Sequence, residues 1–375
     1  MKQSLKKILI VFGTRPEAIK MCPLVKEMQS RGSMEVKVCV TGQHREMLQQ
    51  VLDVFEVTPD YSLDIMQPGQ SLFDVTSRAL TSMEGVLRTY QPDLVFVHGD
   101  TTTAFATSLA CFYLQIPVAH VEAGLRTKNI YSPFPEEYNR QAISLIARYN
   151  FAPTQMARYN LRLEGRAFDS IFVTGNTGID ALRYTVRDDY KSELLDWAAG
   201  SRLLVLTAHR RENLGESMRR MFHAIRRVLD SYDDVKAVYP VHMNPLVQKA
   251  AAEAFSDCDR MRLVAPLDVV AFHNLMSRAY FILTDSGGIQ EEAPSLGKPV
   301  LVMRDTTERP EGVEAGTLRL VGTDEEIIYC ACRQLLDDPE EYASMSKAKN
   351  PYGDGHASAR IAVIVEQQLH VNDRE

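Results

Sequence analysis

Three acidic residues are the strongest candidates for proton transfer in this sequence. Asp100 and Glu122 closely follow the short apolar runs 94–98 and 118–121, and Glu136 comes slightly further along the chain. Carboxylates that converge in a partly dehydrated site repel one another, so at least one should have a raised pKa suited to acid/base chemistry. Asp100 could instead cap a helix, because threonines and an alanine follow it, whereas Glu122 has no such local role.

Two basic residues near the start of the chain could hold a phosphate. Arg15 and Lys20 lie in the segment 13–20, which begins with a glycine and has Pro16 where a helix would start. Free N–H groups at a helix start and two cations would form a phosphate cradle, although both charges could simply be solvated. The segment is neither a P-loop nor G-x-G-x-x-G, which excludes a Walker-type NTPase and the standard dinucleotide motif.

A second group of cations is expected in the second half of the chain. His209 follows the apolar run 203–207 and is itself followed by two arginines, Arg210 and Arg211. A histidine between a strand end and two arginines suits proton transfer beside a phosphate. Arg309 follows a later apolar run and adds a further cation to the same predicted edge.

A Ser-Gly-Gly segment after the apolar run 280–284 predicts a second phosphate cradle. Ser286, Gly287 and Gly288 would place a hydroxyl and bare N–H groups at a positive helix end. Glu292, later in the same helix, could accept hydrogen bonds from ribose hydroxyls, as acidic residues do in nucleotide-binding folds.

The histidines His98 and His120, with Glu122, could also suggest zinc, because H-x-E occurs in nucleobase deaminases. Those enzymes require a P-C-x-x-C partner, which the sequence lacks. The six cysteines are scattered, without C-x-x-C, and are expected to be reduced thiols of the core. We therefore expect neither a metal nor any other cofactor.

Alternating apolar runs and helix-length amphipathic stretches predict parallel βαβ construction. The fold class is α/β, with two Rossmann-like, doubly wound domains facing a central cleft. The polar stretch 188–200 interrupts the pattern and suggests a boundary. We expect an N-terminal Rossmann-like domain at 1–185 with the acid/base carboxylates and a C-terminal Rossmann-like domain at 186–355 with the second phosphate cradle. A final helix at 356–375 could pack on either domain, including back on the first. Ligands should bind at the carboxyl ends of both sheets.

Composition excludes several classes of protein. The chain has 375 residues, 45% of them hydrophobic and 24% charged, which is typical of globular proteins and allows two domains. No apolar run is long enough for a membrane span and the start does not resemble a signal peptide, so we expect a cytoplasmic protein. The net charge of −7 disfavours nucleic acid. It says nothing against a small anionic substrate, because the cations gather at the predicted strand ends.

Nine segments together resemble one family, the bacterial non-hydrolysing UDP-N-acetylglucosamine 2-epimerases. These segments are 12–20, 43–48, 98–102, 120–126, 175–177, 209–212, 285–292, 304–310 and 350–355. The resemblance implies a glycosyltransferase-B-like fold, commonly a homodimer, that interconverts UDP-N-acetylglucosamine (UDP-GlcNAc) and UDP-N-acetylmannosamine (UDP-ManNAc). It further implies elimination of UDP to 2-acetamidoglucal and re-addition, without metal or nicotinamide, to supply ManNAc units for cell-surface polysaccharide.

The resemblance also implies residue roles. The acid/base groups would be Asp100, Glu122, Glu136 and His209. The UDP-sugar would be bound by Arg15, Lys20, Phe272, Ser286, Gly287, Gly288, Glu292 and Arg309. A second UDP-GlcNAc, an allosteric activator in some members, would contact Gln43, His44, Gln70, Arg210 and His242. Two positions depart from some relatives: Leu267 replaces a glutamine near the uracil, and Gly69 replaces an arginine of the activator site.

Three other functions remain as alternatives. A retaining glycosyltransferase of this fold often has two glutamates eight positions apart, but Thr284 stands eight positions before Glu292. A hydrolysing epimerase would release UDP and free ManNAc. A sensor would bind the nucleotide sugar without changing it, which is disfavoured because three converging carboxylates cost stability unless they are used.

Overall fold

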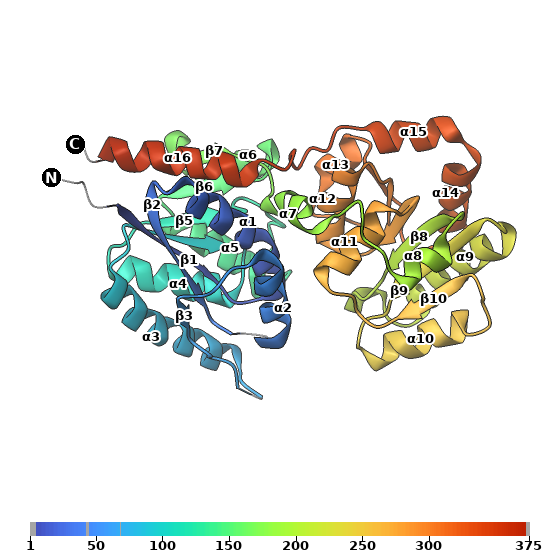
Figure 1. The fold of residues 1–375 in the computed structure, drawn as a ribbon, viewed down its shortest axis with the longest axis horizontal. Coiled ribbons are helices and arrows are strands. Elements are labelled where there is room, and N and C mark those ends of the chain that lie inside the picture. Colours follow the sequence, from blue (N-terminus) through green and yellow to red (C-terminus); the bar gives the residue numbers. More distant parts are fainter. Residues whose placement is uncertain (1–4, 43–44, 68, 373–375) are drawn as a thin grey trace. The chain divides into compact units, whose positions relative to one another are not determined.

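The chain forms two compact units (Figure 1). The computed structural model describes residues 5–42, 45–67 and 69–372. The first unit comprises Met1–Arg183 and Tyr352–Glu375, and the second comprises Tyr184–Pro351. The chain therefore crosses between the units twice, after Arg183 and after Pro351.

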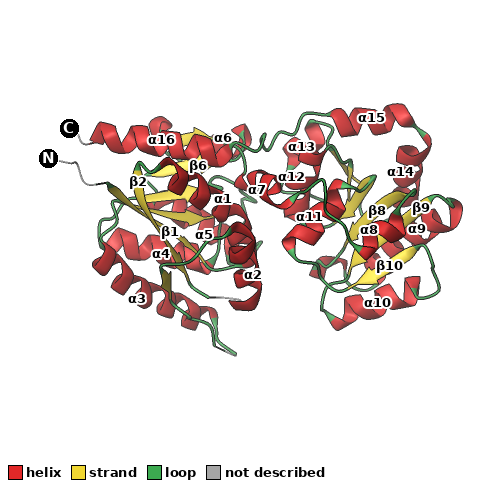
Figure 2. Cartoon of the chain, viewed as in Figure 1, coloured by secondary structure: helices red, strands yellow, loops and turns green. Residues whose placement is uncertain are grey.

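A seven-stranded parallel sheet, in the order β3-β2-β1-β4-β5-β6-β7, forms the centre of the first unit (Figure 2). Its strands are β1 (Lys6–Phe12), β2 (Met34–Val40), β3 (Tyr61–Ser62), β4 (Leu94–His98), β5 (Val118–Val121), β6 (Tyr149–Ala152) and β7 (Ile171–Val173). Its helices are α1 (Arg15–Arg31), α2 (Arg45–Phe55), α3 (Leu72–Tyr90), α4 (Thr102–Tyr113), α5 (Glu136–Ile146), α6 (Gln155–Leu163), η1 (Phe168–Ser170), α7 (Thr177–Thr185) and α16 (Ala357–Asn372). The central strands are continuous apolar runs because helices bury both faces of a parallel sheet.

A six-stranded parallel sheet, in the order β10-β9-β8-β11-β12-β13, forms the centre of the second unit. Its strands are β8 (Arg202–Thr207), β9 (Val235–Pro240), β10 (Met261–Val264), β11 (Phe281–Thr284), β12 (Val300–Val302) and β13 (Leu318–Leu320). Its helices are α8 (Glu193–Ala198), η2 (Arg211–Asn213), α9 (Glu216–Ser231), α10 (Pro245–Phe255), α11 (Val269–Ser277), α12 (Gly287–Glu292), η3 (Ala293–Leu296), α13 (Pro310–Glu314), α14 (Glu325–Asp337) and α15 (Pro339–Lys347).

Both sheets reverse their strand order beside their first strand, between β1 and β4 and between β8 and β11. The helices that follow two such strands lie on opposite faces, so a crevice opens at the carboxyl ends of the pair, where α/β proteins bind ligands. The sequence predicts its phosphate cradles and its first carboxylate directly after these four strands. The topology therefore places those predicted residues at the two ligand-binding edges.

The predicted α/β class with two doubly wound parallel sheets is confirmed. The apolar runs correspond to strands of the structure, but β3 was missed. It has two residues, Tyr61 and Ser62, at the edge of its sheet, and so few residues carry no hydrophobic period. The polar stretch 188–200 contains a short helix, α8, which the Ser192 hydroxyl caps.

The last helix, α16, packs against α1 of the first unit. Glu366 accepts hydrogen bonds from the Arg31 guanidinium at 3.1 Å and from the Ser33 hydroxyl at 2.5 Å. At its start, the Asp180 carboxylate accepts from the N–H groups of Ala357 and Ser358. The end of the chain thus belongs to the unit in which the chain begins.

The cysteines are all free thiols; five are buried and Cys330 is exposed. Burial raises the pKa of the Cys22 and Cys39 thiols to about 12, so both stay protonated near neutral pH. Among the helices of the described ranges, none combines the length and the apolar character that crossing a bilayer requires.

Candidate active site

The turn between β1 and α1 is held by a capping box, and its acidic residue also reaches the next turn. The Thr14 hydroxyl accepts from the N–H of Glu17, and Glu17 Oε2 accepts from the N–H groups of Thr14 at 2.8 Å and Gly13 at 3.0 Å. Glu17 Oε1 accepts from the Thr101 hydroxyl at 2.7 Å. Glu17 is buried, and burial raises its pKa. It thereby joins the turn after β1 to the turn after β4.

Asp100 follows β4 and forms an ion pair with Arg140 of α5. The Asp100 carbonyl accepts a hydrogen bond from Asn139 Nδ2 at 2.9 Å. The cap of α4 is Thr101, whose hydroxyl accepts from the N–H of Ala104 at 3.1 Å. The alternative in which Asp100 caps this helix is therefore wrong, and its carboxylate is left to interact with α5.

Glu122 follows β5 in a left-handed backbone conformation, with φ of 63°, which is uncommon for a residue with a side chain. Its Oε2 is contacted by Lys20 Nζ, by Asn176 Nδ2 at 3.2 Å and by His98 Nε2 at 3.5 Å. Burial by itself would raise the pKa of Glu122, but Lys20 and His98 outweigh burial and hold it well below its usual value. Glu122 is therefore a carboxylate at neutral pH, and Lys20, predicted for a phosphate cradle, is its partner.

Glu136 and Arg15 are the first residues of their helices. Glu136 begins α5, and the next turn of this helix carries Asn139 and Arg140, which contact Asp100. Glu136 Oε2 is buried with no hydrogen-bond partner in the described part of the chain. Arg15 begins α1 and is partly exposed. Since β4 and β5 are paired neighbours, Asp100 and Glu122 lie at adjoining strand ends, with Glu136 on the helix that contacts Asp100.

The two histidines of this edge have partners in the same turns. His120 Nε2 lies 2.7 Å from the Gly99 carbonyl, which can only accept, so Nε2 carries the hydrogen. Burial lowers the pKa of His120 to about 3. His98 faces Glu122. Within the residues that the structure describes, no three His, Cys, Asp or Glu side chains are arranged to hold a metal ion.

Asp285 organises the turns at the switch point of the second sheet. Its Oδ2 accepts from the N–H groups of His209 and Arg210, each at 2.9 Å, and from Asn213 Nδ2 at 3.2 Å. Its Oδ1 lies 3.3 Å from His209 Nδ1. The His209 ring stacks on His242 with centroids 5.5 Å apart. The wholly buried Asp285 carboxylate thus positions the backbone and the imidazole ring of His209.

His209 is held in its neutral form. Burial lowers the pKa of His209, and the neighbouring His242 and Arg210 lower it further, against the attraction of Asp285, which raises it. A neutral imidazole can accept a proton or donate a hydrogen bond at pH 7, which suits either role beside a phosphate.

The start of α12 is in contact with Arg309. The Arg309 guanidinium lies so close to Gly287 that a Cβ there would be 2.6 Å from Nη1. Arg309 Nε donates to Glu291 Oε1 at 2.7 Å. Ser286 is the N-cap of α12, and its side chain makes no capping hydrogen bond. The structure thus brings Ser286, Gly287 and Arg309 together, with Gly288 next in the helix.

Glu292 and Phe272 are linked by a buried histidine. Glu292 Oε2 lies 3.5 Å from His273 Nε2, and His273 Nδ1 lies 2.7 Å from the Thr185 hydroxyl. Phe272, the neighbour of His273 on α11, is partly buried against the core of the second unit. Glu292 and Phe272, predicted for the ribose and the uracil, therefore both adjoin His273.

The positions predicted for an activator are described in part. Gln43 and His44 lie outside the described residues. Gln70 belongs to the first unit, whereas Arg210 and His242 belong to the second and adjoin His209.

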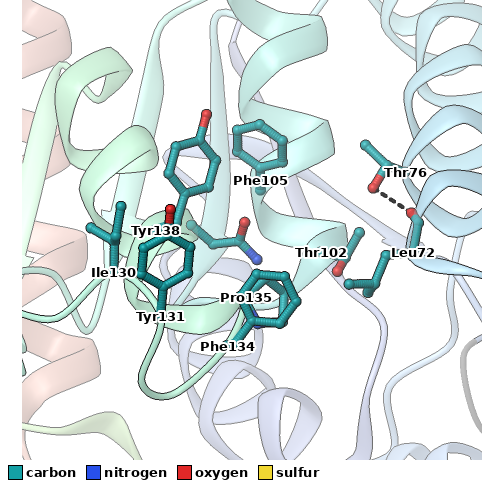
Figure 3. Close-up of a pocket in the computed structure, with 10 residues that line it drawn as sticks. Leu72, Thr76, Thr102, Phe105, Ile130, Tyr131, Phe134, Pro135 and Tyr138 are labelled. Atoms are coloured by element: carbon teal, nitrogen blue, oxygen red, sulfur yellow. Dashed lines mark hydrogen bonds between the residues drawn. The ribbon is translucent and has the colours of Figure 1, made fainter.

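An apolar hollow of about 420 Å³ lies on the first unit, in front of α4 and α5 (Figure 3). Tyr131, Phe134 and Tyr138 line it and are 74%, 62% and 51% exposed. Phe105 of α4 and Leu72 of α3 also line it. Exposed apolar patches of this kind mark interaction sites.

Four side chains that organise the site were not identified as site residues from the sequence: Glu17, Asn176, His273 and Asp285. Glu17 had a signal, because threonine followed three positions later by glutamate is a capping box. Asp285 stands directly after a strand, beside the predicted cradle. Asn176 and His273 act through partners far along the chain, which no local pattern reveals.

Comparisons with known proteins agree with the sequence motifs. The family model described as UDP-N-acetylglucosamine 2-epimerase matches residues 26–366. The UDP-N-acetylglucosamine 2-epimerase of Bacillus subtilis is 60% identical over 369 residues, 98% of this chain and 97% of the relative. An S. aureus MnaA–UDP co-structure has a TM-score of 0.92 and 51% identity, covering 98% and 97% of the two chains.

A further solved structure, the UDP-GlcNAc 2-epimerase of Neisseria meningitidis bound to UDP-GlcNAc, has a TM-score of 0.89 and 48% identity, covering 97% of this chain and 100% of the other. These neighbours confirm the glycosyltransferase-B-like fold class. Motifs, fold and relatives lead to one assignment: the chain belongs to the UDP-N-acetylglucosamine 2-epimerase family.

Proposed function

We propose that this protein is a non-hydrolysing UDP-GlcNAc 2-epimerase, which inverts C2 of the sugar to give UDP-ManNAc. The observation that carries the proposal is Glu122, an ionised and largely buried carboxylate after β5, beside Asp100 at the end of the neighbouring strand β4. An enzyme that moves a proton on carbon needs such a base, and a binding protein does not. The Bacillus subtilis relative is named for this reaction, and the Neisseria meningitidis structure is bound to UDP-GlcNAc.

The proposed reaction is elimination followed by re-addition. A carboxylate takes the C2 proton, the C2–H electron pair forms a C1=C2 double bond, and the C1–O bond breaks to release UDP with its electron pair. The intermediates are UDP and 2-acetamidoglucal. UDP oxygen then attacks C1 while an acid returns a proton to the opposite face of C2. The second face requires a second acid/base group, for which Asp100 and Glu136 are the candidates.

The UDP would be held by the second unit. Arg309, Ser286 and the backbone at Gly287 and Gly288 form a group of donors for the diphosphate, and His209 would donate to the departing phosphate. Glu292 would accept from the ribose hydroxyls, with Phe272 against the uracil. Arg15 would add a cation from the first unit, whereas Lys20 would act on the diphosphate only through its pairing with Glu122.

Incubation of the protein with UDP-GlcNAc in D₂O, followed by NMR, tests this proposal. We expect UDP-ManNAc to appear and deuterium to enter C2 of both sugars, while UDP does not accumulate. Stoichiometric UDP and free ManNAc would show the hydrolysing reaction instead. Sugar transfer to an acceptor without deuterium at C2 would show a glycosyltransferase, and binding without any change would show a sensor.

Three finer properties belong to the same proposal. A homodimer would cover the apolar hollow of Tyr131, Phe134 and Tyr138, because exposed aromatic side chains are favoured at interfaces.

A second UDP-GlcNAc would activate the enzyme, with Arg210 and His242 among its contacts. Initial rates that rise sigmoidally with UDP-GlcNAc, and become hyperbolic in Arg210→Ala, would support the activator site. The product would serve as a source of ManNAc units for cell-surface polysaccharide.

A further inference from the structure

Two segments for which the proposed reaction provides no role, 175–177 and 352–355, meet in the first unit. The N–H of Asn176 donates to the Tyr352 carbonyl at 2.7 Å. Gly175 has φ of 92°, and a Cβ there would lie 3.3 Å from the same carbonyl oxygen. The two backbones are therefore in contact, and this contact fixes the position of the Asn176 backbone, from which its side chain extends.

Both ends of the Asn176 amide are used. Its Oδ1 accepts from the N–H of Gly178 at 2.8 Å in the first turn of α7. Its Nδ2 donates to Glu122 Oε2 at 3.2 Å. If the amide were turned by 180°, its oxygen would face the Glu122 carboxylate and its NH₂ group would face the Gly178 N–H. The chemistry of the two partners therefore determines the orientation of the amide.

Two donors meet at one oxygen of Glu122. Lys20 and Asn176 hydrogen-bond to Oε2, and His98 Nε2 lies 3.5 Å from the same oxygen. The other oxygen, Oε1, faces the turn at Gly99, where a Cβ would be 3.6 Å away and glycine has none. One oxygen therefore anchors the carboxylate and the other is turned toward a backbone without a side chain.

We propose that Asn176 is a positioning residue: with Lys20 it holds Oε2 of Glu122, so that Oε1 is the atom that takes the proton from C2. This inference rests on the proposed epimerase reaction. It gives the segments 175–177 and 352–355 one shared role, because the backbone contact between them aims the amide at Glu122.

Two substitutions separate the donor from the cap. Asn176→Ser keeps a short acceptor for the start of α7 but cannot reach Glu122. Asn176→Asp keeps the acceptor and places a second carboxylate beside Glu122. Loss of a donor favours the protonated form, and a like charge favours it more. We expect the acidic limb of the kcat–pH profile to move up by about one pH unit in the first variant and roughly two in the second. KM should stay near the wild-type value.

Asn160→Ser is the matched control. Asn160 lies on α6, and its Nδ2 donates to the carbonyl of Gly124, in the loop after β5, at 3.0 Å. The substitution removes this donor, which is similar to that of Asn176. Its acidic limb should not move. An equal shift in the Asn160 and Asn176 variants, or no shift in either folded Asn176 variant, would overturn the inference.

Two further readings keep the outcomes distinct. If the Asn176 variants do not fold, the side-chain amide of Asn176 is followed by NMR in the otherwise intact protein: Glu122→Gln should shift its resonances and leave those of Asn160 unchanged, and unchanged Asn176 resonances would refute the contact. If the wild type shows no deuterium exchange at C2, the proposed reaction fails. Exchange in the wild type with unmoved limbs refutes only the role of Asn176.

Discussion

At the residue scale, what each acidic group can do depends on which of its atoms are already occupied. Glu122 has two donors on one oxygen, and Asp100 has an arginine partner. Glu136 instead has a buried oxygen without a partner among the described residues. The three carboxylates that the sequence proposes as acid/base groups therefore differ, and Glu136 has an oxygen that could still gain a hydrogen bond.

His120 should make the protein sensitive to acid. Its pKa is about 3 in the folded protein, against 6.5 for a histidine free in water. Below pH 6.5 the unfolded chain binds a proton that the folded chain does not, so stability falls as the pH falls toward 3. Urea unfolding at pH 6.5 and pH 5 should show that His120→Gln, which can still donate to Gly99 but does not titrate, loses about 2 kcal/mol less than the wild type. Parallel losses in the two proteins would contradict this.

Arg309 should set the affinity for UDP. A lysine keeps the charge but loses the planar guanidinium that contacts both Glu291 and Gly287. We expect Arg309→Lys to weaken UDP binding about tenfold in isothermal titration calorimetry. Arg319→Lys is the control, because Arg319 lies in the same unit and pairs with Glu341. A similar loss in both variants would mean that the effect is not specific to the phosphate group.

At the scale of elements, the turns after β1 and β4 are assembled as one piece. The Thr41 and Thr103 hydroxyls are hydrogen-bonded at 2.9 Å, and together they fill the space beside Gly13. With Glu17 reaching Thr101, the ends of neighbouring strands are linked by side chains as well as by the sheet. A substitution that displaces one turn should therefore displace the other as well.

Gly13→Ala tests this coupling. The new Cβ would lie 2.1 Å from Thr41 Oγ1 and 2.7 Å from Thr103 Oγ1. We expect a loss of about 1–3 kcal/mol in the free energy of unfolding and lower epimerase activity. Gly85→Ala, within α3 and with open space around its Cβ, should raise stability by about 0.5–1 kcal/mol. Thermal or urea unfolding would measure both, and destabilisation of equal size would argue against a steric cause.

At the scale of the whole molecule, two sheets of the same design carry different side chains at their strand ends. Each has its switch point beside its first strand, and the side chains there differ: carboxylates and Lys20 in the first unit, and His209, Arg309 and the Ser-Gly-Gly turn in the second. The net charge of −7 is a sum over the chain and does not describe either edge. Local charge at the strand ends governs binding of an anion.

The proposed homodimer should depend on the apolar hollow. Tyr131→Glu places a charge on a side chain that is 74% exposed, so the fold should be unaffected. We expect the dimer dissociation constant to rise about tenfold or more in sedimentation equilibrium. Tyr159→Glu, on α6 and 57% exposed, is the control. An unchanged constant in Tyr131→Glu would mean that the dimer uses another face.

The sequence by itself determined the strands, their order of appearance and the residues that follow them. Apolar runs, Pro16 and the Thr14–Glu17 pair act through neighbours a few positions away, so their patterns can be read directly. The family was also determined at this level, because nine short segments match it. The short edge strand β3 escaped because two residues form no pattern.

Only the tertiary structure decided which charges are partners. Lys20 and Glu122 are 102 positions apart, and the Asn176 amide reaches a carboxylate 54 positions away. Strand order and backbone contacts bring these groups together, and neither leaves a local trace in the sequence. Lys20 was accordingly predicted for the phosphate, although it pairs with Glu122. The energy of a charge depends on its surroundings in space, and the folded chain alone supplies those surroundings.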